Sequence, residues 1–474
     1  MNQYEISLIN KQREELSEEE FDRINRLTAD MKRANDIFKL IPEALEEFEN
    51  NPEEFINKYN LRLDKSDIFY AFSNANKSVR ENDLKSNDVL SKIPESFFRY
   101  NQYLSNMLAI RNVIRDKYCV PNDMTVRKWR DRQIKRCNGD IGGANKGFIH
   151  AIVTYEMSDG CSVNCKFCGL SAGRLQSIFR YNEENAKLFN GVLNVLKERF
   201  GIAAGMGMMY FASEALDNPD YELFEADYFK IFNYIPQITT AVPTRDIERT
   251  KRLIHELNTK PSYAHRFSIL SLDIARLVID RFSAEELLKV ELLPQFEEAP
   301  TFVPYTVVGK QTGKADDNGT ICCIDGFCIN FAKKTIKLFT PCHANNENPN
   351  GIAIVEEIEF QNEEDFASKL DYLITTYMVN NVPEGALELY DYYRLTDDAV
   401  VSTHGGEKLL FSKLPTYAKD VFLYLQDGTK NKQDIVLSIL KSYDDIKPEN
   451  IFWFINQLWD MGFIKDRIFF DRNK

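Results

Sequence analysis

The chain has 474 residues, of which 44% are hydrophobic, enough for two or three domains that each bury a core. Its formal net charge of -13 argues against broad nucleic-acid binding, which needs basic surface to neutralise phosphates. No stretch is apolar for the length of a membrane span, and residues 1–15 are too polar for a signal peptide. We therefore expect a cytoplasmic protein with no nucleic-acid and no membrane partner.

Residues 1–110 are predicted to form a helical N-terminal domain, followed by a charged bridge over residues 111–146. Ser17 and Glu20 make a capping-box pattern at the start of a helix. Apolar residues then recur at spacings of three and four, which predicts one buried helix face: Phe21, Ile24, Leu27 and Met31. The region can be a plain helical cap or a peptide-binding domain, and we favour the cap.

Residues 147–310 are predicted to form an α/β core, because short apolar runs alternate there with longer helical patterns. Strands are predicted over 149–155, 206–211 and 267–272, and helices over 183–199, 246–257 and 284–292. This alternation predicts a parallel sheet or barrel.

Residues 311–390 are predicted to complete that domain, with a polar loop over 311–319 and two strands around a turn over 320–338. Residues 391–474 are predicted to form a small winged-helix-like unit. It begins with a hairpin that has Gly405-Gly406 at its turn, and three helical patterns follow. A winged helix can pack on the core, bind a peptide or bind DNA, and the acidic chain argues against DNA.

Seven of the nine cysteines fall in two clusters, which in a long intracellular chain suggests metal or redox chemistry. Cys161, Cys165 and Cys168 follow a predicted strand with the spacing C-x3-C-x2-C. Three thiolates leave one iron of a [4Fe-4S] cluster open, and an open iron can chelate S-adenosyl-L-methionine (SAM) and release a 5′-deoxyadenosyl radical. The alternative is a zinc site, which needs four ligands. No second cysteine pair lies nearby, and His150 is expected to point along a strand.

This triad, with Phe167 before its third cysteine, resembles the signature of the radical SAM superfamily. That resemblance implies a partial (β/α)6 barrel. Ala212-Ser213-Glu214-Ala215 resembles the superfamily's Gly-Gly-Glu-Pro motif and implies that the Ser213 backbone and the Glu214 carboxylate bind the SAM amino group. The glycines are missing here, so the backbone contact is less well supported than the glutamate. Ser271 resembles a serine that contacts the ribose; the alternative is a buried strand hydroxyl.

A narrower resemblance runs from about residue 155 to 355. The segments CSVNCKFCGLSAG, SEALDNPDYELFEADYF, PQITTAVPTRDIERTKRLI, RFSILSLDI, TICCIDGF and IKLFTPCHANN are similar to those of radical SAM peptide epimerases of the polytheonamide type. This resemblance implies an isomerase that inverts L-residues to D-residues in a ribosomal precursor peptide, with an electron donor such as flavodoxin or ferredoxin. Residues 391–467 resemble a PqqD-like domain, which implies that the partner is the precursor's leader as well as its core.

Epimerisation by this chemistry requires a hydrogen donor, and a cysteine thiol is suitable because its S–H bond is weak. Cys342 follows an apolar strand and is our first candidate, with Cys323 second. Alternatively, Cys322 or Cys323 with Cys328 and Cys342 could ligate an auxiliary iron–sulfur cluster, or these residues could be core cysteines.

Two other functions of the protein remain open: a radical SAM maturase that crosslinks, cleaves or methylates its peptide, and a non-catalytic leader-binding or electron-transfer iron–sulfur protein.

Overall fold

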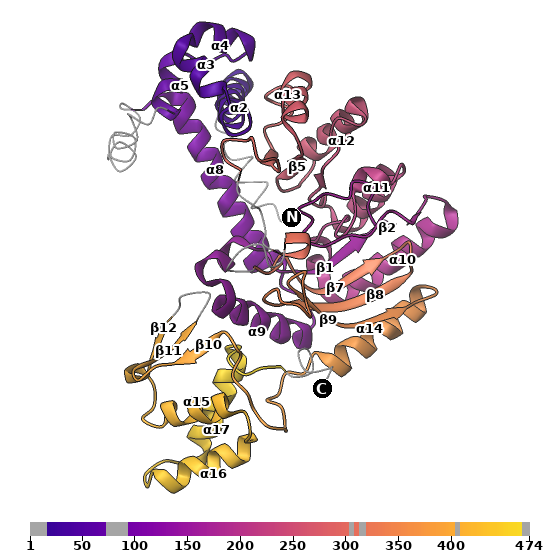
Figure 1. Ribbon diagram of the computed structural model, residues 1–474. Helices are drawn as coiled ribbons and strands as arrows, with labels where there is room; N and C mark the ends of the chain where they lie inside the picture. The colour runs from indigo at the N-terminus through magenta and orange to yellow at the C-terminus, as the bar shows by residue number, and fades with distance from the viewer. Residues whose placement is uncertain (1–16, 73–92, 303–307, 312–318, 403–407, 467–474) are drawn as a thin grey trace. The chain divides into compact units, whose positions relative to one another are not determined.

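The computed structural model (Figure 1) describes residues 17–72, 93–302, 308–311, 319–402 and 408–466. The chain divides into two compact units. The first unit comprises residues 1–113, 161–163 and 208–305, and the second comprises 114–160, 164–207 and 306–474. Both mix helices with strands, so the predicted α/β class is confirmed, whereas none of the described sheets is closed into a barrel.

The first unit begins with the helices α2 (Glu18–Leu40), α3 (Ala44–Asn50), α4 (Pro52–Lys58), α5 (Lys65–Phe72) and α8 (Glu95–Val113). The helix start predicted at Ser17 is confirmed: its side chain caps α2 by accepting a hydrogen bond of 3.2 Å from the Glu20 N–H. Arg33 on α2 donates to the backbone carbonyls of Tyr59 and Phe282. These bonds join α2 to the rest of the first unit, with which it shares one hydrophobic core.

The same unit contains a parallel sheet of three strands in the order β4-β5-β6, whose strands alternate with helices as the sequence predicted. In chain order the elements are α11 (Tyr221–Phe232), β4 (Thr239–Thr240), α12 (Ile247–Thr259), β5 (His265–Ile269), α13 (Leu272–Arg281) and β6 (Val290–Pro294).

Two predictions for this unit were wrong. Residues 206–211 form no strand: they contain single bridge residues at Met208, which pairs with Gln237, and at Tyr210. Residues 284–292 turn and enter β6, where alternating burial of Val290, Glu291 and Leu292 has the two-residue period of a strand.

The second unit is built on a four-stranded sheet in the order β1-β7-β8-β9, with β1 parallel to β7 and the other pairs antiparallel. Its strands are β1 (Ala151–Glu156), β7 (Ile324–Asn330), β8 (Thr335–Pro341) and β9 (Ile352–Glu359), and its helices are α9 (Met124–Ile141), α10 (Glu183–Phe200) and α14 (Glu363–Tyr377). The strand predicted at 149–155 and the strand pair predicted at 320–338 are therefore confirmed with shifted ends. The short strands β2 (Ser158–Asp159) and β3 (Ser177–Ile178) form a separate antiparallel pair.

The C-terminal part of the second unit has its own hydrophobic core. It contains β10 (Tyr393–Leu395), β11 (Ala399–Ser402), β12 (Lys408–Leu410), α15 (Ala418–Asp427), α16 (Lys432–Ser442) and α17 (Pro448–Asp460). The predicted hairpin is an antiparallel sheet of three strands, and the Gly405-Gly406 turn lies outside the described residues. The predicted polar loop over 311–319 likewise lies largely outside them. The Arg132 guanidinium of α9 stacks 4.0 Å from the ring centroid of Trp459 on α17.

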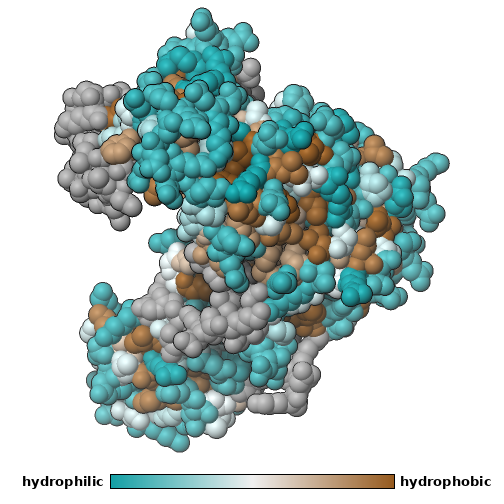
Figure 2. Space-filling model, turned by 45° about the horizontal axis from the view of Figure 1, so that its top comes forward, coloured by the Kyte–Doolittle hydropathy of each residue, from teal (hydrophilic) through white to brown (hydrophobic). Residues whose placement is uncertain are grey.

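No helix in the described part of the chain is long and apolar enough to cross a membrane. Figure 2 shows hydrophilic residues over much of the visible face, interrupted by patches of hydrophobic residues.

Candidate functional site

The three cysteines of the C-x3-C-x2-C segment lie in the loop between β2 and β3, and all three are partly exposed. Pairing of Ser158 with Ile178 brings the two ends of this loop together. Cys119, Cys137, Cys322, Cys328 and Cys342 are buried instead. The predicted cluster ligands thus differ in environment from these five cysteines.

The residue after Cys161 is held by two side chains of the first unit. Asp217 accepts hydrogen bonds from the Ser162 backbone N–H (2.8 Å) and from the Ser162 hydroxyl (2.5 Å). Arg245 pairs with Asp217 at 2.7 Å and also donates to the Ser162 hydroxyl at 2.8 Å. Asp217 and Arg245 belong to two of the segments that carry the resemblance, so these segments fix the first third of the cysteine loop.

The later part of the loop is held within the second unit by Gly309 and Lys310. The Lys310 ammonium donates to the Asn164 side chain at 2.7 Å and to the Cys165 carbonyl at 3.0 Å, and its backbone N–H donates to the Cys168 carbonyl. Gly309 has φ 60°, and a Cβ there would lie 2.3 Å from the Gly169 carbonyl oxygen. The Ala172 N–H points at the Cys168 sulfur at 3.4 Å, a contact of the kind that tunes cluster thiolates.

Glu214 is 4% exposed and joins two segments of the first unit. One carboxylate oxygen accepts from the Leu216 N–H at 3.1 Å and the other from the Ala241 N–H at 2.9 Å. Burial raises the pKa of the Glu214 carboxyl, and these hydrogen bonds oppose the rise. The Thr240 hydroxyl also bonds to this carboxylate, and a carboxylate with three donors can still accept one more, such as an amino group.

The other predicted cofactor residues are placed less distinctively. Ser213 and Phe167 are partly exposed. The Ser271 hydroxyl is not a buried strand hydroxyl, because it accepts from the Ile274 N–H at 3.3 Å and caps α13. Cys161, Ser213, Glu214 and Ser271 belong to the first unit, and Cys165, Phe167, Cys168, Cys323 and Cys342 belong to the second.

The candidate hydrogen donor Cys342 lies directly after β8 and is 4% exposed. Burial raises the pKa of its thiol to about 12, with the nearby Arg136 opposing the shift and Asp140 adding to it. The runner-up, Cys323, is partly buried, and its carbonyl accepts from the Ala151 N–H that begins β1. Cys342 therefore keeps its proton at neutral pH, as a hydrogen-atom donor must.

The cysteines of the second cluster do not share one environment. Cys328 lies beside Glu156 and Lys337, whereas Cys322 lies beside Asp325 and Asp140 and forms a hydrogen bond with the Cys137 thiol. Cys137 comes from α9 and belonged to neither cluster in the sequence. The structure thus places Cys137, rather than Cys328, next to Cys322.

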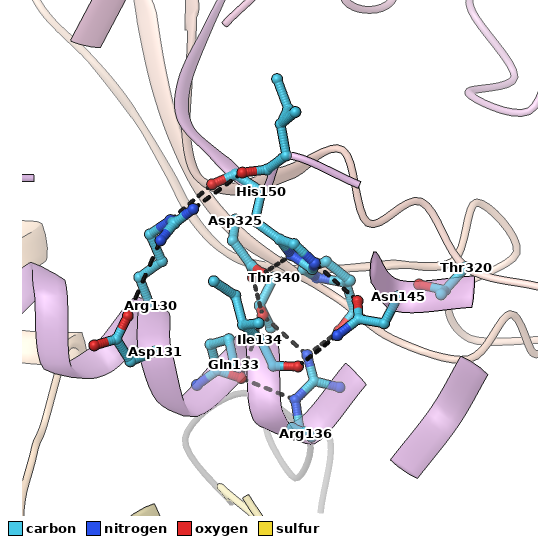
Figure 3. A network of polar contacts seen from close by, with 12 residues as sticks. Arg130, Asp131, Gln133, Ile134, Arg136, Asn145, His150, Thr320, Asp325 and Thr340 are labelled. Carbon is cyan, nitrogen blue, oxygen red and sulfur yellow. Dashed lines mark hydrogen bonds and ion pairs between the residues drawn. The ribbon is translucent and has the colours of Figure 1, made fainter. Parts of the chain in front are cut away.

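Cys137 also takes part in a buried group that the sequence analysis missed. Ligand atoms of Cys137, His150 and Asp325 all lie within 4.8 Å of one another. Figure 3 shows His150 and Asp325 within a polar network that includes Arg136, Asn145 and Thr340. His150 does not point along a strand, as we expected: it precedes β1 with φ 48°, and its ring lies in this network.

One sequence signal could have indicated this network. The helix α9 carries polar residues at helical spacing on its buried face: Arg132, Gln133, Arg136, Cys137 and Asp140. Such a face needs polar partners in the interior. Sequence spacing alone cannot say which distant residues provide them.

No protein-family model and no solved structure matches the chain. Among curated proteins, the chain is similar to the uncharacterized protein y4wI of Sinorhizobium fredii (strain NBRC 101917 / NGR234), with 34% identity over 299 residues. The match covers 60% of this chain and 58% of that protein, so the chain spans little more than half the length of the relative. The relative's name states no activity.

We predict that Asp217→Asn weakens the cysteine loop. The side chain of Asp217 is 1% exposed, and an amide nitrogen in its place would face the N–H donors of Ser162 or Arg245. Loss of such charge-assisted bonds costs about 1.5–3 kcal/mol. Iron and sulfide bound per chain after anaerobic reconstitution should fall, and Asp280→Asn, at a side chain that is 70% exposed, should leave both unchanged. Iron binding equal to that of the wild type would contradict this role.

Proposed function

We propose that the protein is a radical SAM enzyme that matures a ribosomal precursor peptide, inverting L-residues to D-residues. The observation that carries the proposal is the C-x3-C-x2-C loop, whose anchors Asp217 and Arg245 come from the segments that resemble the epimerases. An incidental group of cysteines would not need its backbone fixed by buried charge. A radical SAM partial barrel is part of the proposal, supported by the parallel strands β4, β5 and β6 with their connecting helices.

Cys161, Cys165 and Cys168 suit a [4Fe-4S] cluster, because they are partly exposed and Cys168 receives an N–H bond at its sulfur. The bound cluster and SAM would supply the 5′-deoxyadenosyl radical that removes a peptide α-hydrogen. Glu214 would hold the SAM amino group, since its buried carboxylate can accept one hydrogen bond beyond those from Leu216, Ala241 and Thr240. Burial strengthens that hydrogen bond to a charged carboxylate, because water screens it less.

Cys342 would return a hydrogen atom to the opposite face of the α-carbon. The role requires a thiol rather than a thiolate, because only the thiol carries the hydrogen atom that is given up. Burial of the Cys342 side chain, with its raised pKa, supports that state at neutral pH.

The leader of the precursor would bind the C-terminal sheet. Its order β10-β11-β12 leaves β12 at an edge within the described residues, and an extended peptide can add a strand there. Leader binding would explain why the C-terminal part of the second unit has a hydrophobic core of its own, separate from the sheet β1-β7-β8-β9.

The first prediction of this proposal concerns the reaction itself. Reconstituted, reduced protein with SAM should produce 5′-deoxyadenosine. With its precursor peptide in deuterium oxide, it should add one deuterium per inverted α-carbon and change the peptide mass in no other way. Mass spectrometry and chiral amino-acid analysis provide the measurement. Absence of 5′-deoxyadenosine would refute a radical SAM enzyme, and any other mass change would favour a crosslinking, cleaving or methylating maturase.

Replacement of Cys342 separates the two halves of the reaction. Cys342→Ala should still cleave SAM but should fail to incorporate solvent deuterium into a D-residue, because the hydrogen donor is missing. Cys328→Ala is the matched control, since Cys328 is equally buried but lies beside Glu156 and Lys337. Normal inversion by Cys342→Ala would remove Cys342 from the role and leave Cys323 as the candidate.

The affinity for SAM should rise as the pH is raised through the elevated pKa of Glu214. The amino group donates its hydrogen bond to the carboxylate form of Glu214, and burial raises the pKa of that carboxyl, so deprotonation on raising the pH favours binding. Equilibrium dialysis with Glu214→Gln should give about 10- to 100-fold weaker binding, from a charged hydrogen bond of about 1.5–3 kcal/mol, and a flatter pH profile. Glu225→Gln, at another buried glutamate of the same unit, should behave as the wild type. Unchanged SAM binding by Glu214→Gln would exclude the contact.

A further inference from the structure

The buried group of Cys137, His150 and Asp325 contains a conflict between hydrogen-bonding groups. Figure 3 shows His150 between Asp325 and Asn145. The Asn145 amide nitrogen donates to the Ile134 carbonyl at 2.9 Å, which fixes the orientation of the amide. Its oxygen therefore faces the His150 Nε2 at 2.8 Å and can only accept, so Nε2 must carry the hydrogen.

The other ring nitrogen, Nδ1, lies 2.9 Å from the Asp325 carboxylate. In a neutral ring that donates from Nε2, Nδ1 presents a lone pair to an oxygen that also presents lone pairs. Something positive must lie between them, either a proton or a metal ion. Both side chains are completely buried, where a charged imidazolium is costly.

Two thiols distinguish a metal site from a proton. The Cys137 sulfur lies within 4.8 Å of the ligand atoms of both His150 and Asp325. The Cys322 sulfur is outside that group of three but bonds to Cys137, so its side chain would have to move toward the others to become a fourth ligand. Both cysteines are 0% exposed. A shared proton needs no sulfur beside it, whereas two sulfurs, one nitrogen and one oxygen are the ligand types of a tetrahedral zinc site.

The remaining atoms of the ligands are already engaged, as in an established metal site. The His150 Nε2–H donates to Asn145, and the second Asp325 oxygen accepts from the Thr340 hydroxyl at 2.9 Å. Such outer bonds fix the tautomer of a ligating histidine and orient a ligating carboxylate. They leave Nδ1 and one carboxylate oxygen directed toward the same point.

The charges also balance. Two thiolates and one carboxylate around a divalent cation leave one negative charge, and a buried charge needs a partner. The Arg136 guanidinium, 1% exposed, supplies it beside Asp325 and Cys137, and it is held in place by a 3.1 Å bond to Thr340.

We propose that Cys137, His150, Asp325 and Cys322 bind one divalent metal ion with the ligand preferences of zinc. Bond lengths of about 2.0–2.3 Å in a tetrahedron would separate Nδ1 from the carboxylate oxygen by about 3.3 Å, a small widening of the present contact. All four ligands are buried, so no position is open to substrate, and the ion is structural. It joins α9 to the start of β1 and to β7, and this role is independent of the proposed radical chemistry.

The test uses the full chain with Cys161, Cys165 and Cys168 replaced by Ala, so that the proposed cluster cannot contribute metal. We expect one Zn²⁺ per chain by elemental analysis, and Co²⁺ in its place should show tetrahedral ligand-field bands with thiolate charge transfer. Cys137→Ser and Asp325→Asn should lose the ion. Asn145→Ala, which removes only an outer bond, should weaken binding by about 10- to 100-fold. Cys328→Ser, at a buried cysteine outside the group, should retain one Zn²⁺.

If a ligand variant does not fold, a second measurement can be made on the chain that carries only the three cysteine-to-alanine replacements. Added Zn²⁺ should raise the midpoint of its thermal unfolding after chelator treatment, because an ion that binds only the folded state stabilises it. No bound ion and no rise in midpoint would overturn the site in favour of a buried imidazolium–carboxylate pair. Full Zn²⁺ binding by folded Cys137→Ser would show that the ion lies elsewhere and would overturn it as well.

Discussion

The second unit depends on one constraint: three arginines of α9 are buried, and a buried guanidinium is costly unless its N–H groups find acceptors. Arg130, Arg132 and Arg136 are each at most 4% exposed. Their acceptors include the backbone carbonyls of His150, Val379 and Pro341. The helix therefore holds the residue before β1, the segment that leads to the C-terminal domain and the end of β8. The position of Cys342, next after Pro341, follows from this packing.

Patterns in the sequence correctly predicted the elements that are determined by residues close together in the chain. The cap at Ser17 and the helix at 183–199 depend on neighbours within a few residues, and both are confirmed. The helix expected at 284–292 was wrong, because pairing with β5 makes Val290–Pro294 a strand, and that pairing is not visible in the segment itself. The buried Cys137 group was missed for the same reason, since its members come from α9, the start of β1 and β7. The cysteine loop was found because its residues adjoin one another in the chain.

The two proposed metal sites differ as their chemistry requires. A cluster that binds SAM must leave one iron accessible, and the loop of Cys161 to Cys168 is partly exposed and anchored through its backbone. A structural ion needs a closed set of ligands, and Cys137 with its neighbours is fully buried. Exposure, rather than the number of cysteines, would therefore distinguish the proposed site for chemistry from the proposed site for stability.

The buried group also affects the proposed hydrogen donor. Cys137 is a neighbour of Cys342, and a negative charge on one thiol raises the pKa of another. A metal-bound Cys137 is a thiolate, so part of its charge would favour the protonated state of Cys342, while Arg136 acts in the opposite direction. Burial is the largest influence on Cys342 and has the same sign as that of the thiolate. The packing of α9 that brings the proposed ligands together thus also favours a thiol at Cys342, the form from which a hydrogen atom can be donated.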